Sequence, residues 1–149
     1  MPEMWEEASS LQTKWKAGNI SRFDVTPLFV DFLLPEEANF DAGVFANLYI
    51  ITSKKRGLFG VEASIRSPES RDELRLLLWQ SSWIPFITGN DLWLEDHMDG
   101  AFSMWQHPTC AKHLPTNVPI PKIAQHSLNP NLDPELAAQF WKMGYDLGI

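Results

Sequence analysis

A chain of 149 residues is long enough for one domain with a hydrophobic core and too short for two ordinary ones, so we expect a single domain over residues 1–149. Apolar residues make up 44% of it, which is typical of a globular protein and excludes a largely disordered one. The net charge of −7 argues against a nucleic-acid partner, because phosphate binding requires a basic surface.

The N-terminus and the cysteine content bear on location. The chain starts with acidic residues, whereas a secretory signal starts basic and then turns apolar. No apolar run approaches the roughly 20 residues that a membrane helix needs. Cys110 is the single cysteine, so an internal disulfide is excluded and a reducing compartment is compatible. We expect a cytoplasmic location.

The N-terminal segment 1–20 is predicted to be helical. Residues 3–16 carry a loose apolar stripe, and Gly18 is a stop signal just beyond it. The next apolar segment, 23–34, can be read in two ways. A β-branched pair favours a strand, whereas Pro27 favours the start of a helix, and both alternatives stay open.

Two strands are predicted next. The run 44–52 is almost continuously apolar and rich in β-branched and aromatic residues, which indicates a strand buried on both faces. The polar segment 54–57 ends in glycine and is predicted to be a turn. The segment 58–65 then has the composition of a second strand.

A helix and a short strand follow. Ser67-Pro68-Glu69-Ser70 is typical of a helix start, and the leucines of 72–81 share one helical face. Gly89-Asn90 indicates a turn, after which 92–95 is predicted to be a strand. The proline-rich segment 105–132 is predicted to be a loop, and 133–148 a C-terminal helix. Helices that alternate with strands indicate an α/β fold.

A cluster of polar side chains after the predicted short strand is the first candidate site. Its members are Glu95, Asp96, His97 and Asp99, followed by Gly100. A calcium loop that starts at Glu95 would have its glycine in place, but a histidine at the third position and a glutamine at the twelfth exclude it. We interpret Glu95 and Asp96 as residues of a solvated turn.

Metal and nucleophile motifs were sought elsewhere in the chain. His107, Cys110 and His113 have zinc-like spacing, but a fourth ligand is missing, so we predict no metal and keep a zinc-stabilised domain as an alternative. The sequence contains no G-x-S-x-G motif, and the segment around Ser64 lacks its spacing. It also contains no glycine-rich loop for a nucleotide, so we predict no cofactor.

The stretch from Ser70 to Ser103 resembles the second half of the domain of a known family. It contains Gln80-Ser81-Ser82-Trp83-Ile84-Pro85 and then Met98-Asp99-Gly100-Ala101, which are similar to the "ASxxIP" step and the "DGG" or "DGA" turn of patatin-like phospholipases. Residues 47–52 resemble the strand that ends in threonine in that family, and 133–145 its terminal helix. The resemblance covers most of residues 23–148.

The resemblance implies a fold and a chemistry. It implies a three-layer α/β sandwich with a mainly parallel sheet, and a lipid ester substrate reached through transient membrane contact. In the family, a serine in G-x-S-x-G attacks the ester, and an aspartate in the DG[GA] turn is its base partner. Asp99 matches this aspartate, and Gly100 and Ala101 match the rest of the turn.

The family's serine and oxyanion loop lie upstream of the segments matched here, and the chain starts too late to hold them. We therefore expect a C-terminal portion of a patatin-like lipid acyl hydrolase that is inactive alone, since loss of the nucleophile removes most of the rate enhancement. Such a partial sheet would have exposed edges that favour self-association. The alternative is a non-catalytic α/β binding or interaction module.

Overall fold

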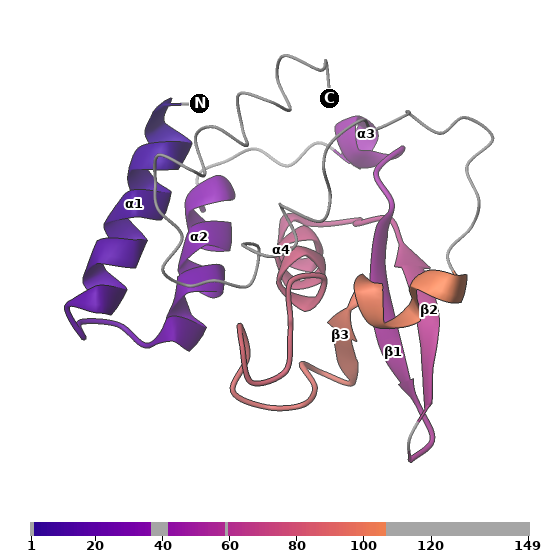
Figure 1. Ribbon diagram of the computed structural model, residues 1–149. Helices are drawn as coiled ribbons and strands as arrows, with labels where there is room; N and C mark the ends of the chain where they lie inside the picture. Colours follow the sequence, from indigo (N-terminus) through magenta and orange to yellow (C-terminus); the bar gives the residue numbers. More distant parts are fainter. Residues whose placement is uncertain (1, 37–41, 59, 107–149) are drawn as a thin grey trace, which may run out of the picture. The chain divides into compact units, whose positions relative to one another are not determined.

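The computed structural model describes residues 2–36, 42–58 and 60–106 (Figure 1). They belong to the first of two units into which the chain divides, Met1–Pro108 and Thr109–Ile149. Several predictions lie outside the described residues: the loop beyond residue 106, the helix over 133–148, and the zinc candidates His107, Cys110 and His113.

The first helix confirms the sequence prediction. α1 spans Pro2–Lys16, and the chain leaves it through Gly18, whose φ of +77° lies in the left-handed region that favours glycine. A short 3-10 turn, η1 (Arg22–Asp24), comes next. It begins with a capping box in which the Asp24 carboxylate accepts a hydrogen bond from the Ser21 N–H at 2.8 Å.

The segment whose type the sequence left open is a helix. α2 spans Val25–Leu33 and packs against α1. Pro27 lies in its first turn. Backbone N–H groups there make no hydrogen bond within the helix, so the missing N–H of proline costs nothing. Leu28 and Phe32 are each 39% exposed, so part of the apolar surface of α2 is not covered by its neighbours.

Three strands form an antiparallel sheet in the order β2-β1-β3, with β1 at Ile50–Arg56, β2 at Gly60–Arg66 and β3 at His97–Asp99. The connection from β1 to β2 turns at Gly57, whose φ is +63°. A connection this short permits only antiparallel pairing. The described residues thus form a mixed α/β fold, and they do not show the mainly parallel three-layer sandwich that the resemblance implies.

The prediction for the run 44–52 is wrong in its first half. Residues Ala42–Phe45 form a short helix, α3, and the strand begins only at Ile50. β1 then continues through Lys54, Lys55 and Arg56, which are exposed and which the sequence predicts to be a turn. A short apolar run does not distinguish helix from strand, and the pairing of β1 with β2 decides where the strand lies.

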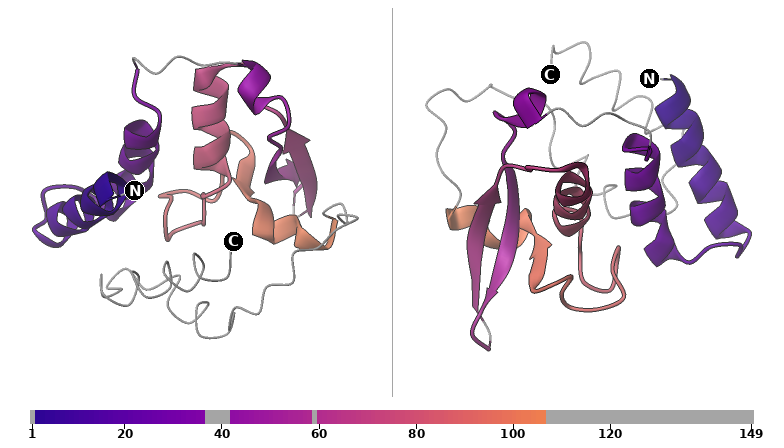
Figure 2. Two further views of the ribbon diagram at one scale, coloured as in Figure 1. Left: turned by 90° about the horizontal axis from the view of Figure 1, so that it is seen from above. Right: turned by 180° about the vertical axis from the view of Figure 1, so that it is seen from behind.

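The predicted helix after the sheet hairpin is confirmed. α4 spans Arg71–Gln80, and Ser70 caps it by accepting a hydrogen bond from the Glu73 N–H at 3.2 Å. The capping hydroxyl is therefore Ser70, whereas Ser67 donates to the carbonyl of Phe45 at 3.2 Å. In Figures 1 and 2, α4 lies between α2 and the sheet.

The two faces of the sheet are covered differently. On one face, Ile50 packs with Leu74 and Leu77 of α4, and Leu77 is fully buried. Side chains alternate along a strand, so Ser53 points to the other face. There it meets η2, a 3-10 segment over Gly100–Gln106 with a kink at Ser103.

Candidate functional site

Asp99, the aspartate singled out by the sequence, lies at the end of β3, and both of its backbone groups are bound. Its N–H donates to the Trp83 carbonyl at 2.9 Å, and its carbonyl accepts from Ser53 Oγ at 2.8 Å. Ser53 Oγ also lies 2.8 Å from Ser103 Oγ, and both serines are fully buried. The main chain at Asp99 is therefore held from the loop after α4 and from β1 together.

The Asp99 side chain is partly exposed and oriented by the next turn. One carboxylate oxygen, Oδ1, accepts a hydrogen bond from the Ala101 N–H at 2.7 Å. This Asx-type contact fixes the carboxylate against its own backbone. A carboxylate held in this way can accept a proton from a hydroxyl group that approaches it.

Gly100 is needed here for space. A Cβ at this position would lie 2.6 Å from the Ile51 carbonyl oxygen, which is backbone and cannot move aside without disturbing β1. The φ of Gly100 is not in the left-handed region, so the turn itself does not require a glycine. The sequence assigned the residue to a tight bend, whereas the structure gives the close approach of two strands as the reason.

The two motifs that carried the family resemblance meet in the structure. Trp83, of the Gln80–Pro85 step, is 5% exposed, and its carbonyl accepts from Asp99, of the turn motif. Its indole covers Gly89, where a Cβ would lie 2.1 Å from the ring atom Cε2. Thr88 stabilises the loop 82–88: its hydroxyl donates to the Ser82 carbonyl at 2.5 Å and accepts from the Ile84 N–H at 2.8 Å.

Glu95 and Asp96 are exposed turn residues, as the sequence indicates. Both have positive φ, +51° and +62°, between Leu94 and His97, which exchange backbone hydrogen bonds of 2.8 and 2.9 Å. This is a two-residue hairpin turn. The strand predicted over 92–95 is therefore displaced: β3 begins at His97, and Leu94 contributes only an isolated bridge to it.

A row of polar side chains crosses the sheet beside Asp99 and was not found from the sequence. Thr52 lies opposite Asp99 on one side and opposite Ser64 on the other, so the three share one face. Thr52 is fully buried. The signal in the sequence was the place of Thr52 at the end of the apolar run 44–52, which predicts a buried strand.

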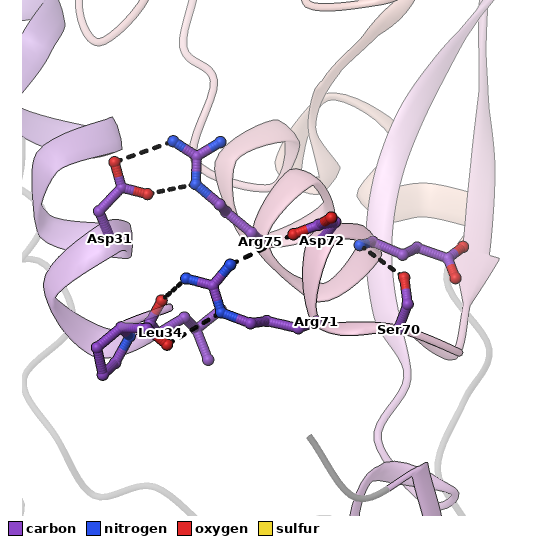
Figure 3. A network of polar contacts seen from close by, with 8 residues as sticks. Asp31, Leu34, Ser70, Arg71, Asp72 and Arg75 are labelled. Carbon is purple, nitrogen blue, oxygen red and sulfur yellow. Dashed lines mark hydrogen bonds and ion pairs between the residues drawn. The ribbon is translucent and has the colours of Figure 1, made fainter. Parts of the chain in front are cut away.

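A second polar cluster joins α2 to α4 (Figure 3). Arg75 forms a two-point ion pair with Asp31, and Arg71 donates to the carbonyls of Leu34 and Pro35 at the end of α2. These side chains border a polar hollow of about 350 Å³ that also includes Asp72. Both arginines bond to partners within the cluster, so its contacts hold α4 against α2.

The Asp31–Arg75 pair makes stability depend on pH. Its hydrogen bonds to Arg75 hold the pKa of the Asp31 carboxyl below its usual value near 3.8. Because this pKa is lower in the folded protein than in the unfolded chain, the ionised carboxylate stabilises the fold at any pH above the unfolded-state value. The contribution is lost as the pH falls through the pKa of the folded state. Because the side chains are 45% and 34% exposed, we expect Asp31→Asn to cost about 0.5–1 kcal/mol at pH 7.

Urea denaturation at pH 7 and below pH 3 measures this effect. The difference in the free energy of unfolding between the wild type and Asp31→Asn is expected to disappear at the lower pH, where the carboxylate is protonated. Asp72→Asn is the matched control, because Asp72 pairs with Arg71 but is 91% exposed. An equal, pH-independent loss in both variants would contradict the role given to the pair.

An apolar hollow of about 400 Å³ lies between α1, α2 and the end of α4. Leu11, Phe29, Val30 and Leu78 are among the residues that line it, and Asp99 is not. The lining of the hollow has no charged side chain among the described residues.

The described residues contain no cluster of three histidine, cysteine or acidic side chains that could hold a metal ion. None of the helices in residues 2–106 that the structure describes is both long and apolar enough to cross a membrane.

Comparison with known proteins adds no assignment. No family model matches the chain, and the searches of curated proteins and of solved structures likewise found no match. The candidate site is therefore defined by its own geometry: a partly exposed carboxylate, Asp99, on a backbone held by Trp83, Ser53 and the close packing of Gly100 on β1.

Proposed function

We propose that this chain is a C-terminal portion of a patatin-like lipid acyl hydrolase in which Asp99 is the carboxylate of a Ser–Asp dyad. The observation that carries the proposal is the hydrogen bond of 2.9 Å from the Asp99 N–H to the Trp83 carbonyl. It joins the two motifs on which the resemblance rests, although they stand 16 positions apart in the sequence (99 minus 83). The proposed substrate is a lipid ester.

The chemistry assigned to Asp99 follows from its surroundings. The Ala101 N–H orients one carboxylate oxygen, and the bound backbone prevents the strand end from shifting. A serine hydroxyl that reached this carboxylate could transfer its proton to it as the oxygen attacks the ester carbonyl. Neither G-x-S-x-G nor an oxyanion loop is present in the 149 residues, so both belong, in this proposal, to a preceding segment of a longer protein.

The proposal includes a larger sheet. The antiparallel strands described here would be one part of the mainly parallel patatin-like sheet, and the remaining strands would come from that preceding segment. One outer strand is already partly covered, because Gln106 accepts from the Ala63 N–H at 2.9 Å and donates to the Val61 carbonyl at 3.1 Å. This side chain occupies edge groups of β2 that could otherwise pair with a second chain.

The 149-residue chain by itself is expected to hydrolyse short-chain p-nitrophenyl esters no faster than buffer. The physical reason is the missing nucleophile, without which a carboxylate has no hydroxyl to activate. Turnover that disappears in Asp99→Asn but persists in Asp96→Asn would contradict the expected inactivity. Asp96 is the matched control, since it lies three residues away on an exposed turn.

Expression together with the coding sequence upstream of Met1 tests the dyad itself. That segment is expected to contain G-x-S-x-G, and Asp99→Asn is expected to lower kcat on an ester by about 10⁴. Asp96→Asn is expected to leave kcat unchanged. An upstream segment without the motif, or hydrolysis retained in Asp99→Asn, would remove Asp99 from the mechanism.

A non-catalytic interaction module is the second candidate, and the exposed apolar side chains of α2 favour it. Leu28, Phe32 and Leu33 are each about two-fifths exposed, at 39%, 39% and 41%. Exposed apolar positions that cluster on one helix are typical of contact surfaces. Native mass spectrometry separates the candidates: a monomer that melts cooperatively favours a self-contained module, and an aggregating chain favours a portion of a larger domain.

A further inference from the structure

The loop between α4 and β3 (Figure 1) holds an aromatic residue in an unfavourable backbone conformation. The Ile84 carbonyl accepts a hydrogen bond from the Ile87 N–H at 3.1 Å, so the chain reverses over Pro85 and Phe86. Phe86 has a φ of +62°. The third residue of a turn with positive φ is normally glycine or asparagine, because a Cβ is strained there. The turn 84–87 therefore carries a phenylalanine where local backbone preference favours another residue.

Packing in the core does not compensate for this strain. Phe86 is 60% exposed and Ile87 is 40% exposed, so most of the aromatic ring lies in solvent. The turn is nevertheless held in place, because the Ile84 carbonyl also accepts from the Thr88 N–H at 3.0 Å. Strained residues persist where other contacts or a function retain them, and they cluster at ligand-binding sites. The turn presents two apolar side chains to solvent on an ordered backbone, and folding alone does not explain them.

One cation is attached to this turn. Arg22 Nη2 donates to the Phe86 carbonyl at 2.7 Å, and the guanidinium carbon lies 4.6 Å from the centre of the Phe23 ring. Arg22 forms no ion pair with any described residue, and residues 80–90 contain no charged side chain. A guanidinium has five N–H donors, and those directed away from Phe86 can bind a phosphate group. The turn thus combines apolar side chains with a cation at its base.

The size and charge of the turn indicate the kind of partner. A standard protein interface takes about 800 Å² from each partner, whereas one phenylalanine buries about 150–250 Å², so this turn is too small for a protein interface. The net charge of −7 argues against a nucleic acid. A phospholipid surface requires no large complementary area. Aromatic side chains lie in its headgroup region, and arginine binds its phosphates.

We propose that this turn inserts Phe86 and Ile87 into the headgroup region of a phospholipid surface, and that Arg22 binds a lipid phosphate there. The inference rests on the proposed function for its purpose, since a lipid ester substrate lies in such a surface. The turn directly follows Trp83, whose carbonyl accepts from the Asp99 N–H, so the lipid surface would be bound beside the loop residue that holds the candidate carboxylate. The insertion itself requires no catalysis.

Flotation of the 149-residue chain with phosphatidylcholine vesicles tests the inference. The wild type is expected to float with the vesicles, and Phe86→Asn is expected to lower the partition coefficient about tenfold. The same variant is expected to raise the melting temperature by about 2 °C, because asparagine adopts a positive φ more readily than phenylalanine. Loss of binding in a more stable protein cannot be attributed to misfolding. Leu58→Asn is the matched control, since Leu58 is 86% exposed between β1 and β2, and it is expected to leave partitioning unchanged.

The cation and the lipid charge are tested in the same assay. Arg22→Gln is expected to lower the partition coefficient about fivefold, through loss of the phosphate contact. Vesicles with about one quarter phosphatidylserine are expected to bind the wild type no more tightly than phosphatidylcholine alone, because a chain of net charge −7 is repelled by an anionic surface. Tighter binding to the anionic vesicles that disappears at high salt would contradict insertion of the turn and indicate a basic patch elsewhere.

Several results would overturn the inference: a wild type that does not float, equal partitioning of Phe86→Asn and the wild type, or an equal loss in Leu58→Asn. A lower melting temperature in Phe86→Asn would overturn it too, since the ring would then stabilise the fold. A dimer in native mass spectrometry that Phe86→Asn abolishes would instead assign the turn to contact with a second copy of the chain. Flotation involves no ester hydrolysis, so failure here is distinguishable from a failure of the dyad, which appears only in hydrolysis.

Discussion

Replacing Gly100 with alanine is expected to destabilise the protein by about 3 kcal/mol. The added Cβ would lie 2.6 Å from the carbonyl oxygen and 3.1 Å from the carbonyl carbon of Ile51. Both are main-chain atoms of β1, so β3 must move away and release the hydrogen bonds that hold Asp99. The midpoint of urea denaturation, followed by tryptophan fluorescence, measures the loss.

Gly18→Ala is the matched control for this substitution. Gly18 has a φ of +77° and no atom within 4 Å of the position of a Cβ, so alanine there meets backbone strain without a clash. We expect a cost of about 1 kcal/mol. Equal losses in the two variants would contradict the close approach of β1 and β3, on which the geometry at Asp99 depends.

Replacing Leu77 with alanine is expected to cost about 2–5 kcal/mol. Leu77 is 0% exposed and packs with Ile50 and Leu74, where the sheet meets α4. Removing three carbon atoms there loses apolar burial and leaves a cavity that the strands cannot fill by a small shift. Thermal and urea denaturation of the purified variant measure the effect.

Leu76→Ala, one position earlier in α4, is its control. Leu76 is only partly buried and does not belong to the cluster of Ile50, Leu74 and Leu77. The same change of side chain is expected to cost about 1 kcal/mol there, because less apolar surface returns to water. A larger loss at Leu76 than at Leu77 would mean that α4 presents a different face to the sheet.

Much of the local structure could be predicted from the sequence. The helices Pro2–Lys16 and Arg71–Gln80 were predicted because their signals lie within a few residues of them: a glycine stop for the first, and serine and acidic residues at the start of the second. The turn at Glu95 and Asp96 was likewise expected. These features depend on local backbone geometry and solvation, which neighbouring residues determine.

The strands were harder to predict, and the reasons are physical. β1 starts at Ile50 and extends through charged residues because β2 pairs along its full length, from Ile50 with Arg66 to Arg56 with Gly60. β3 has three residues, too few to show an alternating pattern, and its position follows from the hairpin turn before it and from β1 beside it. Such pairing joins residues far apart in the chain, and periodicity in one segment carries no information about its partner.

The sequence by itself determined the helices Pro2–Lys16 and Arg71–Gln80, the exposed turn and the candidacy of Asp99, because each depends on residue types close together in the chain. Only the tertiary structure decided what surrounds that carboxylate. The Trp83 carbonyl accepts a hydrogen bond from the Asp99 N–H, and Gly100 allows the chain to pass close to the Ile51 carbonyl. The buried residue Thr52 lies opposite Asp99 on β1. Each of these contacts requires strand register and packing, which exist only once distant segments have come together.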